Sequence, residues 1–348
     1  MSKLKAMKSV YCYFFPETRS LLREVSNALP DSMYLVTTPA EEIYKRLEPL
    51  FTPPLDIPAT PEGYVDLDEI HGPIIKRIVK AYSSIVPALS DFKFSYPTSG
   101  SSEGIFKLLT KLKIEDIESI NVFDGEYEGY EEYAGHDDLK IRVRKFDFRK
   151  TNSKKCEPGV WFISNPSSCD GNIIPNEFIT DLCDAGNKVI LDLAYVGATR
   201  QHKFDISHEN IPAVVMSFSK SYGVFRFRIG GFAFSREPIH SLYGNKWFKD
   251  TESLCQALKI SETIGPSKLY SKYRPVQEEI VTEINDEFGL GMMVSDSFLL
   301  GHLTEEDAER LDTSQLDLIK PFKRGRNYRF CLTPYYEEKE QKCEKNDI

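Results

Sequence analysis

The residues best suited to covalent chemistry lie in one segment, 217–231, which contains Lys220 and Arg228. The apolar residues 213–216 precede this segment and predict a buried strand. A lysine at the dry end of a strand can lose its proton and form a Schiff base with an aldehyde. Arg228, eight positions after Lys220, can hold a phosphate together with nearby serine hydroxyls. The alternative is a surface lysine, with Arg228 in an ordinary salt bridge.

An aldehyde that carries a phosphate describes pyridoxal phosphate, and the segment resembles the Schiff-base lysine motif of class I/II aminotransferases. These are fold-type-I pyridoxal phosphate enzymes. Their pattern, S-x-S-K-x-x-G followed by R-x-G, matches Ser217, Ser219, Lys220, Gly223, Arg228 and Gly230. The resemblance implies that Lys220 carries the cofactor, with Ser219 among the cofactor-binding residues. It also implies that Ser217 and Arg228 bind the cofactor's phosphate.

Segment 98–105 predicts further phosphate contacts, because a predicted strand, 92–96, precedes it and a predicted helix follows. Free backbone N–H groups at a helix N-terminus, with serine hydroxyls beside them, suit a phosphate. Serine is also common there as an ordinary helix cap. The segment resembles the family's G-[SA]-[DS]-E-x-I segment, which implies that Gly100, Ser101 and Ser102 bind the cofactor.

Two loops are expected to contact the cofactor ring. Residues 124–130 resemble the family's P-x-[YF]-x-x-Y loop, which implies that Tyr127 stacks on the ring, although Gly125 replaces the proline. Residues 165–171 resemble the turn N-P-x-N-P-x-G, whose second asparagine bonds to the ring hydroxyl. Ser168 stands at that position here, and serine has a shorter reach. Either Ser168 acts through a water or Asn165 takes the role.

The apolar residues 189–191 are followed by Asp192 and, three positions later, by Tyr195. A carboxylate at the end of such a strand is costly unless it is paired, and one alternative is an aspartate that caps a neighbouring loop. The pair matches the family's D-x-x-Y. The resemblance implies that Asp192 keeps the cofactor's ring nitrogen protonated and that Tyr195 contacts the ring hydroxyl.

Segment 328–333 predicts a strand with an inward-pointing Arg329. It resembles the family's R-[IF]-x-[VL]-[GT] segment, which implies that Arg329 grips the substrate's α-carboxylate through a planar, two-pronged contact. We expect Arg324 and Arg326 to lie at the surface. A weaker match, Tyr64, corresponds to a family tyrosine that reaches the neighbouring subunit's phosphate.

The elements that must position these residues alternate along the chain. Apolar strand candidates alternate with helical candidates, which predicts an α/β fold: a mostly parallel sheet sandwiched by helices, followed by a smaller α+β C-terminal domain. The strand candidates are 119–123, 141–148, 160–164, 189–194, 214–217 and 231–235. The helical candidates are 73–84, 102–111, 175–185 and 240–258.

The expected domain organisation has four parts. Residues 1–75 are proline-rich and are expected to be extended or helical, and residues 76–245 form the large cofactor-binding domain. Residues 246–334 form the small domain, with long helices near 247–260 and 266–288 and short strands at 293–299 and 328–332. Residues 335–348 are a charged tail, expected to be solvated and partly frayed.

Composition excludes several other classes of protein. The chain has 348 residues and a net charge of −9, which disfavours nucleic acid or an anionic membrane as a partner. No apolar run approaches the ~18 residues of a membrane span, and residues 1–10 lack a signal-peptide core. Seven scattered cysteines without a C-x-x-C pair indicate reduced thiols, a cytoplasmic location and no zinc site.

The resemblance covers roughly residues 63–333 and implies a pyridoxal-phosphate-dependent aminotransferase that uses an amino acid and a 2-oxo acid. Chain length and the short stretch after Lys220 are most similar to the histidinol-phosphate aminotransferase branch. The alternatives are a decarboxylase or a β/γ-eliminating lyase with the same cofactor, or a non-catalytic relative. Tyr64 and the extended N-terminal stretch favour a homodimer. Arg226 either binds an anionic substrate group or faces the subunit interface or a surface carboxylate.

Overall fold

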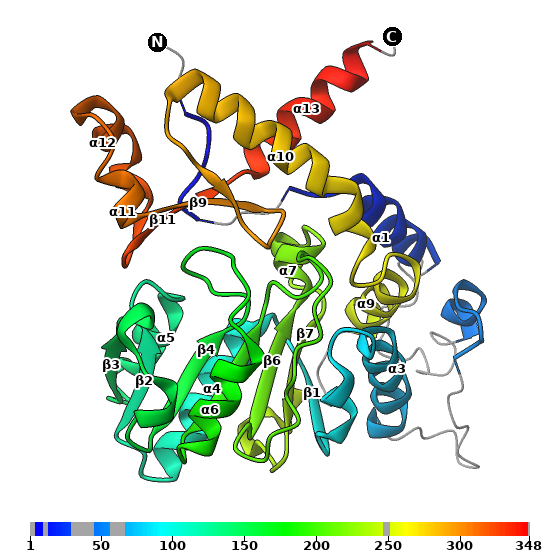
Figure 1. The fold of residues 1–348 in the computed structure, drawn as a ribbon. Helices are drawn as coiled ribbons and strands as arrows, with labels where there is room; N and C mark the ends of the chain where they lie inside the picture. The colour runs from blue at the N-terminus through cyan, green and yellow to red at the C-terminus, as the bar shows by residue number, and fades with distance from the viewer. Residues whose placement is uncertain (1–3, 10–12, 29–44, 56–66, 246–250, 347–348) are drawn as a thin grey trace, which may run out of the picture.

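A computed structural model describes residues 4–9, 13–28, 45–55, 67–245 and 251–346. Two β-sheets organise these residues: a seven-stranded sheet between Phe94 and Ser235 and a four-stranded sheet between Met293 and Cys331. The small sheet lies above one edge of the large one in Figure 1. Within the described ranges, no helix is long and apolar enough to cross a membrane.

The large sheet is mostly parallel, as the sequence predicts. Its strand order is β1-β7-β6-β5-β4-β2-β3, and only β7 runs against its neighbours. The seven strands are β1 Phe94–Thr98, β2 Ser119–Phe123, β3 Arg142–Phe146, β4 Val160–Ser164, β5 Lys188–Leu193, β6 Ala213–Ser217 and β7 Gly231–Ser235. Parallel strands end at a common edge, so the residues that follow β2, β4, β5 and β6 lie close together.

The two faces of the large sheet bury alternate residues of its strands, because successive side chains point to opposite faces. Ile190 and Val215 join the apolar cluster beneath α4 (Ser101–Ile114) and α5 (Gly129–Ala134). Leu191 and Val214 join the larger cluster on the other face. That face is covered by α6 (Asn176–Asp184), α3 (Leu67–Tyr82) and α9 (Thr251–Thr263). Both faces are therefore dry, as a parallel sheet requires.

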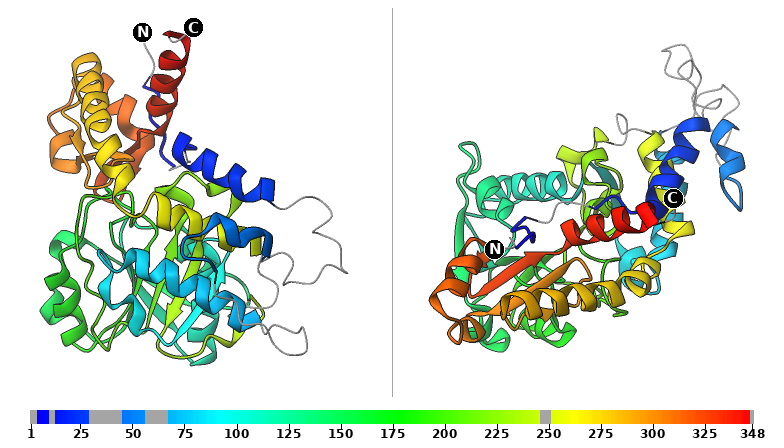
Figure 2. Two further views of the ribbon diagram at one scale, coloured as in Figure 1. Left: turned by 90° about the vertical axis from the view of Figure 1, so that its right-hand side faces the viewer. Right: turned by 90° about the horizontal axis from the view of Figure 1, so that it is seen from above.

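The small sheet is antiparallel, with strand order β10-β11-β9-β8. Its strands are β8 Met293–Val294, β9 Leu300–Thr304, β10 Lys323–Arg324 and β11 Asn327–Cys331. The helices around it are α10 Lys268–Phe288, α11 Glu305–Ala308, α12 Thr313–Ile319 and α13 Thr333–Asn346. Figure 2 shows α10 and α13 running side by side across this part of the molecule. Together they form the smaller α+β unit that the alternation predicts.

Two segments near the N-terminus pack on the two sheet-containing units. Helix α1 (Pro16–Ala28) lies beside α9. Residue Met7 pairs with Cys331 through two backbone hydrogen bonds of 3.1 and 2.8 Å, which extends the edge of the small sheet. The N-terminal residues therefore reach the region between the two sheets.

Several local expectations need correction. The segment from Tyr335 is not a frayed tail, because α13 includes it and Tyr336 is buried. Helix α3 begins at Leu67, so it crosses the boundary expected at residue 75. The strand expected at 293–299 is only two residues long, and β9 begins at Leu300 instead. Its sequence, LGHLT, contains a glycine that weakens the strand pattern.

Candidate active site

Twelve of the fourteen predicted site residues line one pocket of about 250 Å³, the Lys220 pocket. It lies outside the carboxyl ends of β4, β5 and β6, and the small sheet closes it from the other side. The twelve are Gly100, Ser101, Ser102, Tyr127, Ser168, Asp192, Tyr195, Ser217, Ser219, Lys220, Arg228 and Arg329. Residues more than 200 positions apart in the chain therefore form one site, at the edge where open parallel sheets bind ligands.

Lys220 is positioned by the end of strand β6. Ser217 ends the strand and caps the short helix α7 (Phe218–Ser221), because its Oγ accepts a hydrogen bond of 3.2 Å from the N–H of Ser219. This cap turns the chain and brings Lys220 over the pocket. The Lys220 Nζ lies 4.0 Å from the ring centre of Tyr195 and 5.8 Å from that of Tyr127. Two aromatic rings therefore flank the amine.

Asp192 ends up buried beside that amine, with only 4% of its surface exposed. Its Oδ1 accepts a 3.0 Å bond from the N–H of Ala194, and its Oδ2 a 3.2 Å bond from the hydroxyl of Tyr130. Burial raises the pKa of the Asp192 carboxyl, and the positive charge of Lys220 opposes that rise. The carboxylate thus depends on cations in the pocket for its stability.

The opposite end of the pocket is suited to an anion. Helix α4 begins at Ser101, so its first N–H groups point toward the pocket after Gly100, whose φ is +84°. Arg228 lies against this turn and donates to the carbonyl of Ser99. A Cβ at Gly100 would lie 2.7 Å from Arg228 Nη2, so only glycine allows this approach.

The loop after β2, which carries Tyr127, is held at the same end of the pocket. The hydroxyl of Tyr127 hydrogen-bonds the Oγ of Ser102 at 3.0 Å, which ties the loop after β2 to the first turn of α4. A Cβ at Gly129 would lie 2.3 Å from the Tyr127 ring, so the ring packs directly on the backbone of α5. The Tyr127 ring therefore has a fixed place at the wall of the pocket.

Arg329 is a buried cation without an acidic partner among the described residues. It is 3% exposed, and no carboxylate in the described part of the chain lies within 4.0 Å of it. Its Nη1 donates to the carbonyl of Ser168 at 2.5 Å, and its Nη2 to the carbonyl of Lys8 at 2.6 Å. Its Nε has no partner there, and burial lowers the pKa of the guanidinium. Such a group is costly unless an anion binds to it.

Among the described residues, one predicted site residue, Asn165, is not brought into the pocket. The side-chain amide of Asn165 donates to the carbonyl of Ile174 at 3.0 Å and accepts from its N–H at 2.9 Å. Asn165 does not line the pocket. Ser168 does line it, and its Oγ lies 3.3 Å from Arg329 Nη1. Tyr64 lies outside the described residues. Between the two alternatives for the ring contact, the geometry favours Ser168.

Sequence reasoning missed Arg324, which we expected at the surface. Its side chain is only 6% exposed, lines the Lys220 pocket and forms a 2.8 Å ion pair with Glu128. The turn at Gly325, with φ of +52°, reverses the chain so that Arg324 faces the pocket. No local signal in the sequence marked this burial, because strand alternation would place residues 324 and 326 on the same face. Arg326 lies outward, paired with Asp147 and Glu305, as expected.

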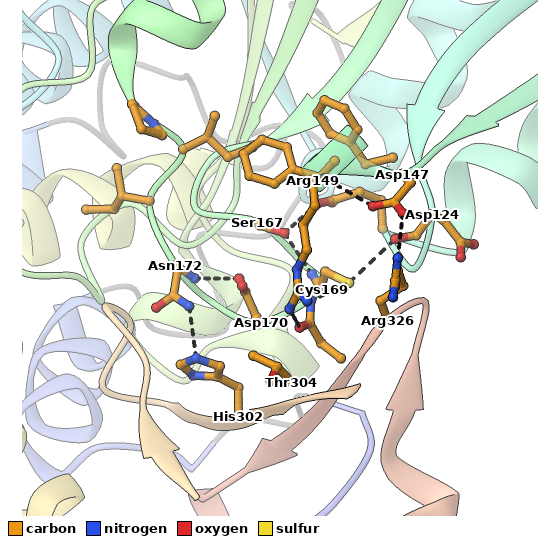
Figure 3. Close-up of a pocket in the computed structure, with 17 residues that line it drawn as sticks. Asp124, Asp147, Arg149, Ser167, Cys169, Asp170, Asn172, His302, Thr304 and Arg326 are labelled. Carbon is orange, nitrogen blue, oxygen red and sulfur yellow. Dashed lines mark hydrogen bonds and ion pairs between the residues drawn. The ribbon is translucent and has the colours of Figure 1, made fainter. Parts of the chain in front are cut away.

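A second cavity of about 320 Å³ lies on the other side of the turn Ser167–Cys169. Figure 3 shows Asn172 and His302 facing each other across its floor, and Arg326 bonded to Asp147 on its wall. The other two sides are apolar, with Phe123 and Phe148 in edge contact at 5.1 Å. The turn after β4 therefore separates two cavities.

Comparison with known proteins agrees with this architecture. The Lys220 pocket and the large sheet define a fold-type-I pyridoxal phosphate protein. The family model of class I and II aminotransferases matches residues 96–263, just under half of the chain. The chloroplastic histidinol-phosphate aminotransferase of Nicotiana plumbaginifolia is 36% identical over 93 residues. That match spans 26% of this chain and 22% of the relative's length.

Solved structures with the same fold catalyse different reactions. An aminotransferase from Staphylococcus aureus superposes with a TM-score of 0.61 at 14% identity, covering 95% of this chain and 90% of that one. The L-threonine-O-3-phosphate decarboxylase from Porphyromonas gingivalis has a TM-score of 0.55 at 13% identity, covering 94% and 93%. The pyridoxal-phosphate-bound C-S lyase from Staphylococcus hominis has a TM-score of 0.59 at 9% identity, covering 93% and 86%. These likenesses show the fold.

Pyridoxal 5'-phosphate is the cofactor of this family, and the residues of the Lys220 pocket fit it. The hydroxyl of Tyr195 is buried and has no hydrogen-bond partner among the described residues. It lies on the same wall as Lys220 and Asp192, while the start of α4 and Arg228 supply donors for a phosphate. An amine, a carboxylate and an anion site are thus present together, which is the donor set that this cofactor needs.

Proposed function

We propose that the protein is a pyridoxal-phosphate-dependent aminotransferase that acts on an α-amino acid and a 2-oxo acid. Arg329 is the observation that carries this proposal. A buried guanidinium without an acidic partner in the described chain is stabilised when it binds a carboxylate, and it lies in the same pocket as Lys220. Amino and 2-oxo acids both carry that carboxylate.

In this proposal, the bound cofactor supplies an aldehyde that takes up an amino group and an electron-poor ring that accepts electrons from the substrate's α-carbon. The residues of the chain do the rest. Lys220 Nζ holds the aldehyde carbon in the resting state and then moves a proton at the substrate's α-carbon. Asp192 keeps a proton on the ring nitrogen, and Tyr195 donates to the ring hydroxyl.

The remaining residues bind and orient. Ser101, Ser102 and the backbone at Gly100 hold the phosphate at the start of α4. Ser217, Ser219 and Arg228 hold it from the side of α7. Tyr127 covers one face of the ring, and Ser168 contacts the ring hydroxyl. Arg329 fixes the substrate's carboxylate, and this orients the bond that breaks at the α-carbon.

Decarboxylation or β/γ-elimination is the second candidate, because structures with the same fold include a decarboxylase and a C-S lyase. The cofactor and the residues around Lys220 serve all three reactions. The outcome depends on which bond at the substrate's α-carbon stands perpendicular to the ring. Arg329 would favour transamination over decarboxylation by holding the carboxylate away from the position in which a bond breaks.

The first test of this function is covalent trapping at Lys220. Purified holoprotein should absorb near the visible edge, and borohydride reduction should attach the cofactor permanently to the peptide that contains Lys220. Lys220→Ala should bind the cofactor without permanent attachment. Attachment at a different lysine contradicts the proposal.

The reaction itself is then assigned by products. A panel of amino acids is incubated with the holoprotein, and 2-oxo acid, carbon dioxide, thiol and ammonia are measured in parallel. Stoichiometric 2-oxo acid with transfer of the amino group to an acceptor supports an aminotransferase. Release of carbon dioxide, or of thiol with ammonia, supports the second candidate instead.

A further inference from the structure

One buried charge close to the Lys220 pocket has no role in the proposed mechanism. Glu126 follows strand β2 and is 6% exposed, in the wall between the Lys220 pocket and the second cavity. An isolated carboxylate at such a place is costly, so its hydrogen bonds must compensate for lost hydration. Burial raises the pKa of the Glu126 carboxyl, and its hydrogen bonds oppose that rise.

The compensating donors all come from the end of β4 and the turn that follows it. The Oε1 of Glu126 accepts from the Oγ of Ser167 at 2.6 Å. Its Oε2 accepts from the hydroxyl of Ser164 and from the backbone N–H of Ser168 at 3.2 Å. One carboxylate therefore binds three groups within five positions of the chain, and it holds this turn against the loop that carries Tyr127.

The same turn supports Arg329. The N–H of Ser168 donates to the Oγ of Ser164 at 2.9 Å and to Glu126 at 3.2 Å, and Glu126 also orients the Ser164 hydroxyl. The carbonyl and the Oγ of Ser168 accept from Arg329 Nη1 at 2.5 and 3.3 Å. Both ends of the Ser168 backbone are thus fixed. A shift of this residue would move the guanidinium, since its other described bond is to the carbonyl of Lys8.

We propose that Glu126 is a positioning residue that fixes the turn Ser164–Ser168 and, through Ser168, sets the orientation of Arg329 for the substrate's carboxylate. The proposal rests on the proposed function only for the identity of the ligand. Glu126 contacts neither substrate nor cofactor, so its effect is transmitted through the backbone of Ser168. Figure 3 shows Ser167 and Cys169, which flank this residue, at the wall of the second cavity.

The test compares two substitutions in the holoprotein. Glu126→Ala removes all three bonds and should lower kcat/KM about 10- to 100-fold, mainly by raising KM, because the guanidinium is misplaced. Glu126→Gln keeps the size and one acceptor oxygen, which can serve the Ser168 N–H, and should stay within about fivefold of the parent. Absorbance of the bound cofactor should be normal in both.

Asn187→Ala is the matched control for general loss of stability. Asn187 is fully buried, accepts from Trp161 Nε1 at 3.0 Å and donates to the carbonyl of Leu182 at 3.0 Å. It lies at the amino end of β5, away from the pocket. This variant should lower Tm and leave KM unchanged.

A separate readout does not depend on turnover. In cofactor-free protein, phenylglyoxal should label Arg329 faster in Glu126→Ala than in the parent, and peptides spanning 164–171 should exchange their amide hydrogens faster. Neither change is expected in Asn187→Ala. If the parent turns over no amino acid, the proposed function fails while this readout still tests Glu126.

Three results would overturn the role of Glu126. The first is an unchanged KM and labelling rate in Glu126→Ala. The second is an equal rise of KM in Asn187→Ala, which would make the effect one of general stability. The third is a Glu126→Gln variant as impaired as Glu126→Ala, which would assign the effect to negative charge rather than to hydrogen bonding.

Discussion

Single residues in the Lys220 pocket carry an excess of positive charge. The lining cations are Lys220, Arg228, Arg324 and Arg329, and the lining carboxylates are Glu128 and Asp192. Like charges in a partly buried site repel, so this arrangement is most stable with anions bound. A phosphate at one end and a carboxylate at the other would balance it. The net charge of the pocket lining is thus positive, whereas the net charge of the whole chain is −9.

Arg329→Lys tests the carboxylate contact at the residue scale. Lysine keeps the charge but loses the planar fork. The fall in kcat/KM for the amino acid should therefore correspond to a loss of roughly 2–5 kcal/mol in transition-state stabilisation. Steady-state kinetics measure this loss, and cofactor absorbance should remain normal. Arg310→Lys, at a position where 81% of the side chain is exposed, should change neither quantity. Parental kcat/KM in Arg329→Lys would place the carboxylate elsewhere, and loss of cofactor would put Arg329 in the wrong half of the site.

His302 should give the protein a defined sensitivity to acid. It is 8% exposed, and its Nδ1 lies 3.1 Å from Ser295 Oγ and its Nε2 3.4 Å from Asn172 Nδ2. Burial lowers its pKa from 6.5, so below that pH the unfolded chain takes up a proton that the folded chain resists. Stability should therefore fall as pH drops through 6.5 and be unaffected above it.

His302→Gln makes this measurable as a difference in urea unfolding. Between pH 6.5 and the lowered pKa, the parent should lose up to about 1.4 kcal/mol per pH unit more than the variant. Above pH 7.5 the difference between the two proteins should be constant. Parallel curves down to pH 5 would show that His302 takes up its proton as readily in the folded state.

At the scale of elements, the ends of strands and helices place the chemistry. Asp192 lies on β5, and β6 is followed at once by the turn into α7 that carries Lys220. Elements remote from the pocket stabilise the small unit by packing, and α13 is the clearest example. Its Tyr336 donates to the carbonyl of Phe298 at 2.6 Å and packs on the ring of Tyr273 at 5.5 Å.

Tyr336→Ala should therefore destabilise the protein, although the segment around it is strongly charged. Loss of a buried ring and its hydrogen bond should cost roughly 3–5 kcal/mol in the free energy of unfolding, measured by urea denaturation. Lys342→Ala, on the same helix with 70% of its side chain exposed, should change it by less than about 0.5 kcal/mol. Equal small effects would mean that α13 does not dock in solution.

At the scale of the whole molecule, charged side chains join the two sheets beside the second cavity. Arg326, from the small sheet's hairpin, bonds Asp147 after β3 at 3.0 Å, and Arg149 pairs with Glu306 on α11. These groups are partly exposed, so each pair contributes little by itself. The pairs instead join the hairpin and α11 of the small unit to the segment after β3 of the large one.

The protein should be a homodimer in solution. The motivation is the Tyr64 match and the proline-rich N-terminal stretch, to which the structure adds Phe227, 52% exposed close to the Lys220 pocket. Light scattering should give twice the mass of one chain, and Phe227→Glu should shift the equilibrium toward monomer. A monomer with full cofactor occupancy would count decisively against this assembly.

The sequence by itself determined the class of fold and most of the site. Short, nearly continuous apolar runs, each followed by polar residues, are local signals, and they predicted both the parallel sheet and the places of Lys220 and Asp192. The family resemblance, together with strands that end at one edge, led us to expect fourteen residues at one site, and one pocket contains twelve of them. Whether each has its implied role remains a prediction.

Only the tertiary structure decided where side chains in irregular turns point. Asn165 turns to Ile174 and Ser168 to Arg329, although the two residues are three positions apart in one loop. Arg324 is buried because a hairpin in the small sheet faces a loop of the large one, which no local pattern encodes. The bonds of Glu126 likewise join two loops about 40 positions apart. Contacts of this kind arise from packing, because strand period specifies a face but not the partner across a gap.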